Sequence, residues 1–533
     1  MVRSLILFAL VASAVVAVWH GLGKRHPVPA SPIGPDEKLT CISYAPFHDG
    51  QAPFMLNLAI PESQIEGDLK QLAEITSCVR TYAAMGPQGA VTRLAAKHGL
   101  AVLQGIWLNR NRADNRREIE AALALAKAYP ETIKALIVGN EALLRGELSE
   151  SDVRAYLEEV RQRSGLRSTY ADVWEFWLEH RELASATDFI TVHILPYWEN
   201  NPVAAEKVGA HLRDVMLRVR EAFPGKEILI GEVGWPSAGR MREAALPSPL
   251  NQARAVSEVV AAAKEQGWRV NIIEAYDQHW KRVLEGTVGG HWGLYDDRTR
   301  ALKFRFGEPV SNHPDWMIKA GLGVGAAALA FMSLGLGGLG RGARGWRRDL
   351  GAAVIALASG LTFGLAATNL AIENALPGES ARAVIMLALA LAVPMAGAFA
   401  LGKGLELPGF AMALDPNQWR GPARDGAILA ALLVATVVAA IHVALGLVFD
   451  ARYRDFPFAA LTGPVTALAV VAFTSARGGL QPGTAEIAAA CVLTGSALFI
   501  IANEGASNWQ AVWVALLFVA LALTVLQARG ARG

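Results

Sequence analysis

Seven long apolar runs follow Trp316, and they constrain this chain of 533 residues more than any other feature. They cover residues 317–339, 350–372, 383–402, 426–449, 458–475, 485–503 and 509–527. Each run is close to the ~20 residues that an α-helix needs to cross a bilayer. The sequence therefore predicts an all-α transmembrane helical domain over residues 313–533.

An eighth apolar stretch, Leu5 to Trp19, lies near the N-terminus between Arg3 and the polar string 24–27. This pattern predicts either a signal anchor or a cleavable signal peptide with Ala12-Ser13-Ala14 as its cleavage string. We favour the anchor, because apolar residues continue past that string to about the length of a tilted span. Both interpretations export the domain that begins at residue 30, and residues 1–29 form the anchor and its linker.

The basic residues indicate how the spans are oriented. Loops on one predicted side and the C-terminal tail carry Arg341, Arg344, Arg347, Arg348, Lys403, Arg420, Arg424, Arg477, Arg529 and Arg532. The other loops mix both signs, with Glu373, Glu379, Asp450, Arg452 and Glu504. By the positive-inside rule both termini lie in the cytoplasm and residues 30–316 lie outside. The sequence thus predicts a multi-pass protein of the inner (cytoplasmic) membrane, with its large domain on the periplasmic or extracellular side.

Residues 30–312 alternate β-rich runs with amphipathic helical segments, as in repeated βαβ units. Strands are predicted over residues 40–46, 77–82, 100–106, 134–140, 167–172, 188–193, 226–232 and 269–276. Eight such units predict an α/β fold, a (β/α)8 TIM barrel. A doubly wound sheet fits less well, because no glycine-rich phosphate loop follows the first strand. Ser63 and Glu66 predict a capping box at the first helix.

Two glutamates lie at the ends of the fourth and seventh predicted strands. Glu141 follows Gly139-Asn140, and Glu232 ends the run that begins at Glu227. A single Asn-Glu dipeptide is most often a solvated loop carboxylate. Two glutamates at strand ends of a barrel lie where such folds place their active sites, and two carboxylates suffice to cleave a glycosidic bond.

At these strings the chain resembles glycoside hydrolase family 17. Its matches are Gly139-Asn140-Glu141 and 231–237 (GEVGWPS), together with the strings at 43–47 (SYAPF), 80–82 (RTY), 193–197, 276–278 (YDQ) and 291–295 (HWGLY). Val233 departs from the small residue that plant members carry, and the string at 43–47 is more similar to the bacterial branch. The resemblance implies a β-1,3-glucanase or β-glucan transglycosylase.

A retaining mechanism assigns roles to these residues. Glu232 would be the nucleophile and Glu141 the acid/base, and Asn140 would bind the sugar 2-hydroxyl. Aromatic side chains at strand ends would stack on sugar rings. The predicted substrate-binding residues are Tyr44, Arg80, Trp107, Asn140, His193, Tyr197, Trp198, Trp235, Tyr276, Gln278, Trp280 and Trp292.

Other classes of site receive no support from the sequence. The soluble part has no P-loop, metal-spaced His/Cys cluster or nucleophile elbow, so we expect no nucleotide, flavin or metal cofactor. The net charge of +2 does not suggest nucleic acid as a partner. Cys41 and Cys78 lie on neighbouring predicted strands, and we expect them to pack as thiols rather than as a disulfide.

Two classes of function remain. The first is a membrane-anchored enzyme that acts on β-glucan, either transferring glucanosyl units in β-1,3/β-1,6-glucan remodelling or synthesis, or simply hydrolysing β-1,3-glucan. The second is a catalytically inactive glucan-binding domain on a transporter-like membrane part. We favour transfer, because a tether serves an enzyme that works where glucan is made or exported. The expected partners are a β-glucan, the lipid bilayer and glucan synthesis or export machinery.

Overall fold

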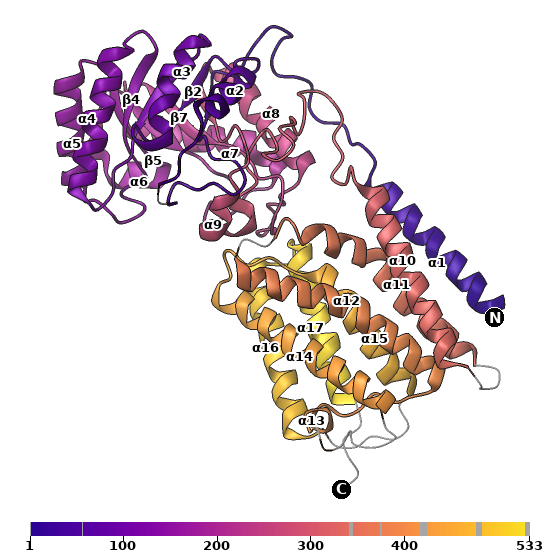
Figure 1. The fold of residues 1–533 in the computed structure, drawn as a ribbon. Coiled ribbons are helices and arrows are strands. Elements are labelled where there is room, and N and C mark those ends of the chain that lie inside the picture. The colour runs from indigo at the N-terminus through magenta and orange to yellow at the C-terminus, as the bar shows by residue number, and fades with distance from the viewer. Residues whose placement is uncertain are drawn as a thin grey trace. The chain divides into compact units, whose positions relative to one another are not determined.

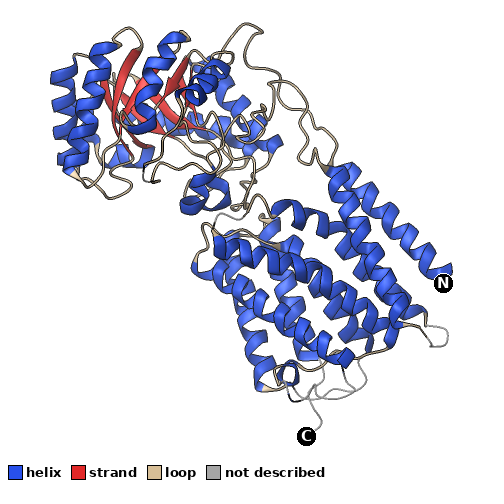
Figure 2. Ribbon diagram, in the orientation of Figure 1, coloured by secondary structure: helices blue, strands red, loops and turns tan. Residues whose placement is uncertain are grey.

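The computed structural model describes residues 2–55, 57–339, 345–373, 376–415, 417, 424–475 and 482–527. The chain forms two compact units. The barrel unit comprises residues 26–238 and 244–310. The membrane unit comprises residues 1–25, 239–243 and 311–533. Figure 1 shows the order of the elements along the chain, and Figure 2 shows that strands occur in the barrel unit, with helices around them.

Eight parallel strands close into a barrel in sequence order. They are β1 (Cys41–Ser43), β2 (Cys78–Arg80), β3 (Ala101–Ile106), β4 (Ile133–Asn140), β5 (Ser168–Val173), β6 (Ile190–His193), β7 (Ile228–Val233) and β8 (Arg269–Ile272). Each lies within, or within one residue of, a predicted strand, so the (β/α)8 prediction is confirmed. The strands are short and apolar because both faces of a parallel barrel are buried.

Helices separate these strands and cover the outside of the barrel. The α-helices are α2 (Glu62–Leu72), α3 (Val91–Lys97), α4 (Arg112–Ala128), α5 (Glu150–Ser164), α6 (Trp174–Glu179), α7 (Val208–Ala222), α8 (Pro249–Gln266) and α9 (Arg282–Gly289). Short 3-10 turns occur at η1 (Gly86–Ala90), η2 (Arg181–Ala186), η3 (Ala205–Lys207) and η4 (His279–Lys281).

Local signals set several helix starts. The predicted capping box at Ser63 and Glu66 is wrong, because α2 already begins at Glu62, after Pro61, and has no side-chain cap. Pro61 is the N-cap residue, with φ of −59° and ψ of 137°, and its ring fixes φ just before the first turn. A capping box does form at α5, between Ser149 and Asp152.

A disulfide joins Cys41 of β1 to Cys78 of β2. The expectation that these two cysteines pack as thiols is therefore wrong. The register pairs Ile42 with Val79 on the two parallel strands, so the preceding residues also lie opposite each other. This adjacency depends on strand register, which the spacing of 37 residues does not reveal.

The membrane unit consists of helices. They are α1 (Val2–Leu22), α10 (Trp316–Gly337), α11 (Trp346–Asn369), α12 (Pro377–Lys403), α13 (Phe410–Ala413), α14 (Arg424–Phe449), α15 (Phe458–Ser475), α16 (Thr484–Glu504) and α17 (Trp509–Gln527). Seven of the described helices are long and apolar enough to cross a membrane, and α15 is apolar but shorter. Arg341, Arg344, Arg420, Arg477, Arg529 and Arg532, on which the predicted orientation partly depends, lie outside the described residues.

Helix α1 packs within the membrane unit against α10 and α11. The rings of Phe8 and Phe331 meet edge to face at 5.9 Å, and Trp19 meets His313 in the same way at 5.4 Å. Trp19 and Val15 are buried. The N-terminal helix and the first helix after the barrel are therefore neighbours, as Figure 1 shows.

Candidate active site

Glu141 and Glu232 meet at one end of the barrel. Glu141 follows directly on β4, and Glu232 lies within β7. Both belong to a group in which one carboxylate oxygen of each glutamate and one ring nitrogen of His193 all lie within 4.8 Å of one another. This spacing is compatible with the ~5 Å that separates the carboxyl groups of retaining glycosidases, whereas inverting enzymes need a wider gap.

His193, the last residue of β6, lies between the two carboxylates. Its Nδ1 is 2.7 Å from Oε1 of Glu141, and its Nε2 is 3.6 Å from Oε1 of Glu232. The histidine side chain is fully buried. The imidazole therefore forms a hydrogen bond with Glu141 and lies beside Glu232 without a hydrogen bond to it.

The two glutamates have different surroundings. The side chain of Glu232 is 6% exposed, and that of Glu141 is 22% exposed. Glu141 also has a positive φ of 51°, after Gly139 with φ of 86°. Non-glycine residues rarely adopt this conformation, and when they do it is often at a functional site. The turn brings the Glu141 side chain to the barrel opening.

Arg80, at the end of β2, donates hydrogen bonds to several groups around Glu232. Its Nη1 donates to Glu232 Oε1 at 2.6 Å and to the Gly231 carbonyl at 3.0 Å, and its Nη2 donates to the Asn140 side-chain oxygen. Asn271 also donates to the Gly231 carbonyl, at 2.7 Å. The barrel interior below the acids is thus a hydrogen-bonded polar layer.

Charge and burial act in opposite directions on Glu232. Burial raises its pKa, but the interactions with His193, Arg80 and Lys281 outweigh burial and lower the pKa below its usual value. A lowered pKa keeps the carboxylate ionised at neutral pH. An ionised carboxylate in a water-poor site can act as a nucleophile.

A second ion pair lies near Glu232 that the sequence analysis missed. Lys281 Nζ lies 2.9 Å from both carboxylate oxygens of Glu274. Burial raises the pKa of Glu274 to about 7, although Lys281 acts against this. Burial also raises the pKa of Glu285, which lies in the fields of Glu141 and Glu232. Glu274 closely follows an apolar strand, as Glu141 does, so the same pattern could have revealed it.

Asp172 is another buried acid that the sequence analysis missed. It lies on β5 and accepts a hydrogen bond from the Tyr170 hydroxyl. Burial raises its pKa to about 6, and the charge of Glu141 adds to this effect. No motif distinguishes Asp172 from other strand residues.

Most of the predicted substrate-binding aromatics are buried. Tyr197, Trp235 and Trp292 are almost fully buried, and both tryptophan rings lie 6.2 Å from the Tyr197 ring. Tyr44 donates to Asp68 at 2.9 Å, and Tyr276 donates to Gln71 at 2.7 Å. These side chains support the walls of the site.

Three predicted tryptophans keep partial exposure, namely Trp107, Trp198 and Trp280. The guanidinium of Arg145 lies over the Trp107 ring at 4.3 Å. Trp280 donates to Gln278 at 2.8 Å and meets Phe54 edge to face. These three rings are the best placed of the set to meet a sugar face.

Two groups of described side chains have a geometry that could hold a metal ion. One is the pair of catalytic candidates with His193, and the other is Asp277, His279 and His291. In the second group the Asp277 carboxylate already binds the ammonium of Lys303 at 2.6 Å. A second cation there would meet like-charge repulsion.

Comparison with known proteins agrees with this geometry. Residues 41–293 match the model of the BtgE/BtgC glycoside hydrolase domain. A glucan 1,3-beta-glucosidase of Saccharomyces cerevisiae is 26% identical over 262 residues, which cover 44% of this chain and 82% of that protein. A glucan 1,3-beta-glucosidase of Candida albicans is 27% identical over 271 residues, which cover 45% of this chain and 85% of that protein.

Solved structures also resemble the barrel. The family 17 β-1,3-glucanosyltransferase of Rhizomucor miehei is 23% identical, with a TM-score of 0.43, over 50% of this chain and 97% of that structure. The family match ends at residue 293, before the first helix that follows the barrel. The family match and the curated relatives identify the barrel of this chain as a glycoside hydrolase domain similar to the BtgE/BtgC type, an enzyme that acts on O-glycosyl bonds, with glucan 1,3-beta-glucosidases among its relatives.

Proposed function

We propose that this chain is a membrane-anchored retaining enzyme that cleaves β-1,3-glucan and transfers the glucanosyl unit to an acceptor sugar, in β-1,3/β-1,6-glucan remodelling or synthesis. The observation that carries the proposal is that carboxylate oxygens of Glu141 and Glu232 lie within 4.8 Å of each other, next to the buried His193. The names of the relatives supply the substrate class.

The first chemical step breaks the glycosidic bond. The Glu232 carboxylate attacks the anomeric carbon and forms a glycosyl ester, while Glu141 gives its proton to the leaving oxygen. Asn140 would hydrogen-bond the sugar 2-hydroxyl. Because its side-chain oxygen accepts from Arg80, its amide nitrogen is the group that donates.

The second step reverses these roles. Glu141, now a carboxylate, takes a proton from the incoming hydroxyl, whose oxygen attacks the anomeric carbon and releases Glu232. Water as the acceptor gives hydrolysis, and a sugar hydroxyl gives transfer. A sugar held against Trp107, Trp198 or Trp280 would compete with water through its effective concentration. The net configuration is retained in both cases.

The proposed location is the inner (cytoplasmic) membrane, with the barrel on the periplasmic or extracellular side. The disulfide between Cys41 and Cys78 supports this side, because disulfides persist in oxidising compartments. The polysaccharide substrate would also be found there. The membrane helices would keep the enzyme near glucan synthesis or export machinery.

The product pattern of the full-length protein tests this function. The protein in detergent micelles is incubated with short β-1,3-gluco-oligosaccharides at millimolar concentration, and products are separated by size. We expect products longer than the starting chain, with β configuration at the new bond. Shorter products alone would identify a simple hydrolase, and α-linked products would contradict a retaining pair.

Substitutions of the two acids test the residues themselves. Glu232→Ala should abolish turnover, because no nucleophile remains. Glu141→Gln should lower kcat by about 10²- to 10⁴-fold, the usual contribution of a general acid. With Glu141→Ala, azide should restore part of the activity on activated glycosides. Glu147→Gln, which alters a partly exposed acid that pairs with Arg145 near Glu141, is the matched control. Wild-type rates in Glu232→Ala or Glu141→Gln would instead favour an inactive glucan-binding domain.

A further inference from the structure

The loop between β7 and α8 is shared between the two units. Residues 239–243 belong to the membrane unit, whereas the residues on both sides belong to the barrel unit. Within the barrel unit, Trp235 Nε1 donates to the Leu246 carbonyl at 3.1 Å, and the Ser237 backbone N–H donates to the His291 carbonyl at 2.8 Å. The base of the loop is thus closed in the barrel unit, and its tip is part of the membrane unit.

The tip carries a buried arginine. The side chain of Arg240 is 2% exposed, and it pairs with Glu504, which is 7% exposed and ends α16. The same guanidinium donates to the carbonyls of Ala451 and Arg454, and it lies over the Phe456 ring at 4.6 Å. A buried charge of this kind is stable only with such a complete set of partners.

Side chains of the membrane unit also hold the backbone of the tip. The Met241 N–H donates to Gln510 at 2.8 Å, and its carbonyl accepts from Asn508 at 2.9 Å. Glu504 accepts from the Glu243 N–H at 3.3 Å and from Asn508 at 2.8 Å. The tip is therefore fixed by its main chain as well as by its charge.

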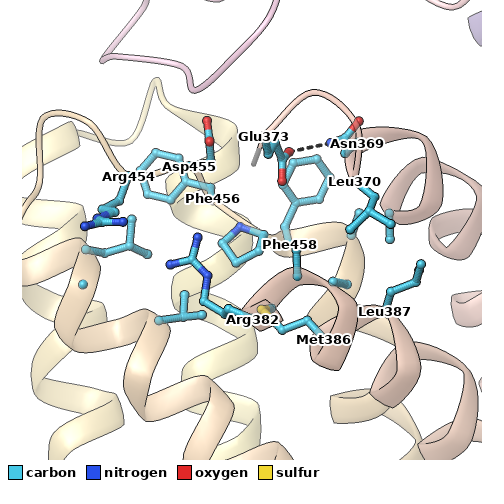
Figure 3. Close-up of a pocket in the computed structure, with 18 residues that line it drawn as sticks. Asn369, Leu370, Glu373, Arg382, Met386, Leu387, Arg454, Asp455, Phe456 and Phe458 are labelled. Carbon is cyan, nitrogen blue, oxygen red and sulfur yellow. Dashed lines mark hydrogen bonds between the residues drawn. The ribbon is translucent and has the colours of Figure 1, made fainter. Parts of the chain in front are cut away.

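Residues 451–456, which contact Arg240, have further contacts within the membrane unit. Arg454 pairs with Glu379 at 2.6 Å and with Asp450 at 2.8 Å. Arg454, Asp455 and Phe456 line a pocket of the membrane unit, which Figure 3 shows together with the hydrogen bond from Asn369 to Glu373. This segment is held in place on several sides, so it can act as a fixed support.

We propose that Arg240 is a positioning residue for the nucleophile, and that its ion pair with Glu504 makes the glycosidase activity depend on the folded membrane unit. Glu232 and Arg240 are eight residues apart on one continuous stretch of chain. Trp235 and Ser237 lie between them, and both are fixed in the barrel unit. Without the tip contacts, the segment after β7 would keep the barrel-unit contacts of Trp235 and Ser237 but lose those of residues 240–243, and small displacements of a reacting carboxylate are costly in rate.

The test uses the full-length protein in proteoliposomes and an activated aryl β-glucoside, and it rests on the proposed function because it needs that activity. Glu504→Gln should lower kcat by about tenfold and change KM by less than about twofold, because positioning of the nucleophile affects the chemical step more than binding. Arg240→Lys, which keeps a cation opposite Glu504, should keep at least half of the wild-type kcat. A purely structural role for Glu504 predicts less folded protein, measured by size-exclusion chromatography, with an unchanged kcat per folded molecule.

Asp349→Asn is the matched control. Asp349 is another buried carboxylate of the membrane unit and pairs with Arg3, remote in sequence from the loop. We expect this variant to keep the wild-type kcat. If Glu504→Gln fails to insert, the double variant Asn508→Ala and Gln510→Ala, which removes both contacts to Met241, should lower kcat in the same way.

Three outcomes would overturn the inference. The first is a wild-type kcat in Glu504→Gln or in the double variant. The second is an equal loss in Asp349→Asn, which would show a general effect of membrane-unit stability. The third is a wild-type protein without activity, which would contradict the proposed function as well, whereas the first two leave that function intact.

Discussion

At the scale of single residues, the site depends on side chains that each contact several partners. Arg80 contacts Glu232, Asn140 and the Gly231 carbonyl at once. The sequence predicted Arg80 and His193 only as substrate-binding residues, because a motif shows that a residue is present but not which side chain it faces. Glu141 and Glu232 could be predicted because each follows a β-rich run.

The Arg80 contact predicts a change in pH dependence. The pKa of Glu232 is lowered because His193, Arg80 and Lys281 together outweigh burial. In Arg80→Leu one of these groups is lost, so the pKa of Glu232 rises and the carboxylate is protonated at a higher pH. The acid limb of kcat/KM should therefore move upward by about one unit or more, as measured over a pH series.

Two further variants control this experiment. Arg80→Lys keeps the charge and should leave the acid limb close to that of the wild type. Arg117→Leu removes an arginine of an exposed pair with Asp114 and should have no effect on the profile. An unchanged acid limb in Arg80→Leu would show that His193 and Lys281 alone keep Glu232 ionised.

At the scale of elements, the sequence predicted the eight strands well and their contacts poorly. Buried parallel strands are short apolar runs, which a single sequence reveals directly. The Cys41–Cys78 disulfide depends on the register of β1 against β2, and the salt bridge of Lys281 with Glu274 depends on how the segment after β8 folds back. Such contacts follow from tertiary structure, so no local pattern could predict them.

The disulfide should stabilise the barrel. It closes a loop with a sequence separation of 37 residues, for which the chain-entropy model gives about 4 kcal/mol. The double variant Cys41→Ser and Cys78→Ser should therefore lower the melting temperature of the barrel, followed by near-ultraviolet circular dichroism of its tryptophans. Cys491→Ser, which changes a free cysteine, is the control. Equal melting temperatures for wild type and double variant would mean that the bond adds no stability.

At the scale of the whole molecule, the division into a barrel and a helical part was predictable from hydropathy alone. Seven described helices are long and apolar enough to span a bilayer. The barrel unit ends at Val310. The grouping of residues 239–243 with the membrane unit was not predictable, because this stretch has no apolar run.

The proposed orientation can be tested with reporters inserted in the full chain. A reporter that is active only outside the cytoplasm should be active at Asn312 and inactive in the arginine-rich loop after α10. We expect this reporter pattern because arginine-rich loops are retained in the cytoplasm. The opposite pattern would place the barrel in the cytoplasm and contradict the proposed orientation.

The pairing of α1 with α10 bears on how the protein is made. About 290 residues separate the end of α1 from the start of α10, and they include the entire barrel. At about 5–20 residues per second, the ribosome needs tens of seconds to supply α10 after α1 has emerged. In the proposed orientation, α1 lies in the bilayer without α10 while the barrel is synthesised and crosses the membrane. Assembly of the helical part can therefore be completed only after the barrel has been synthesised.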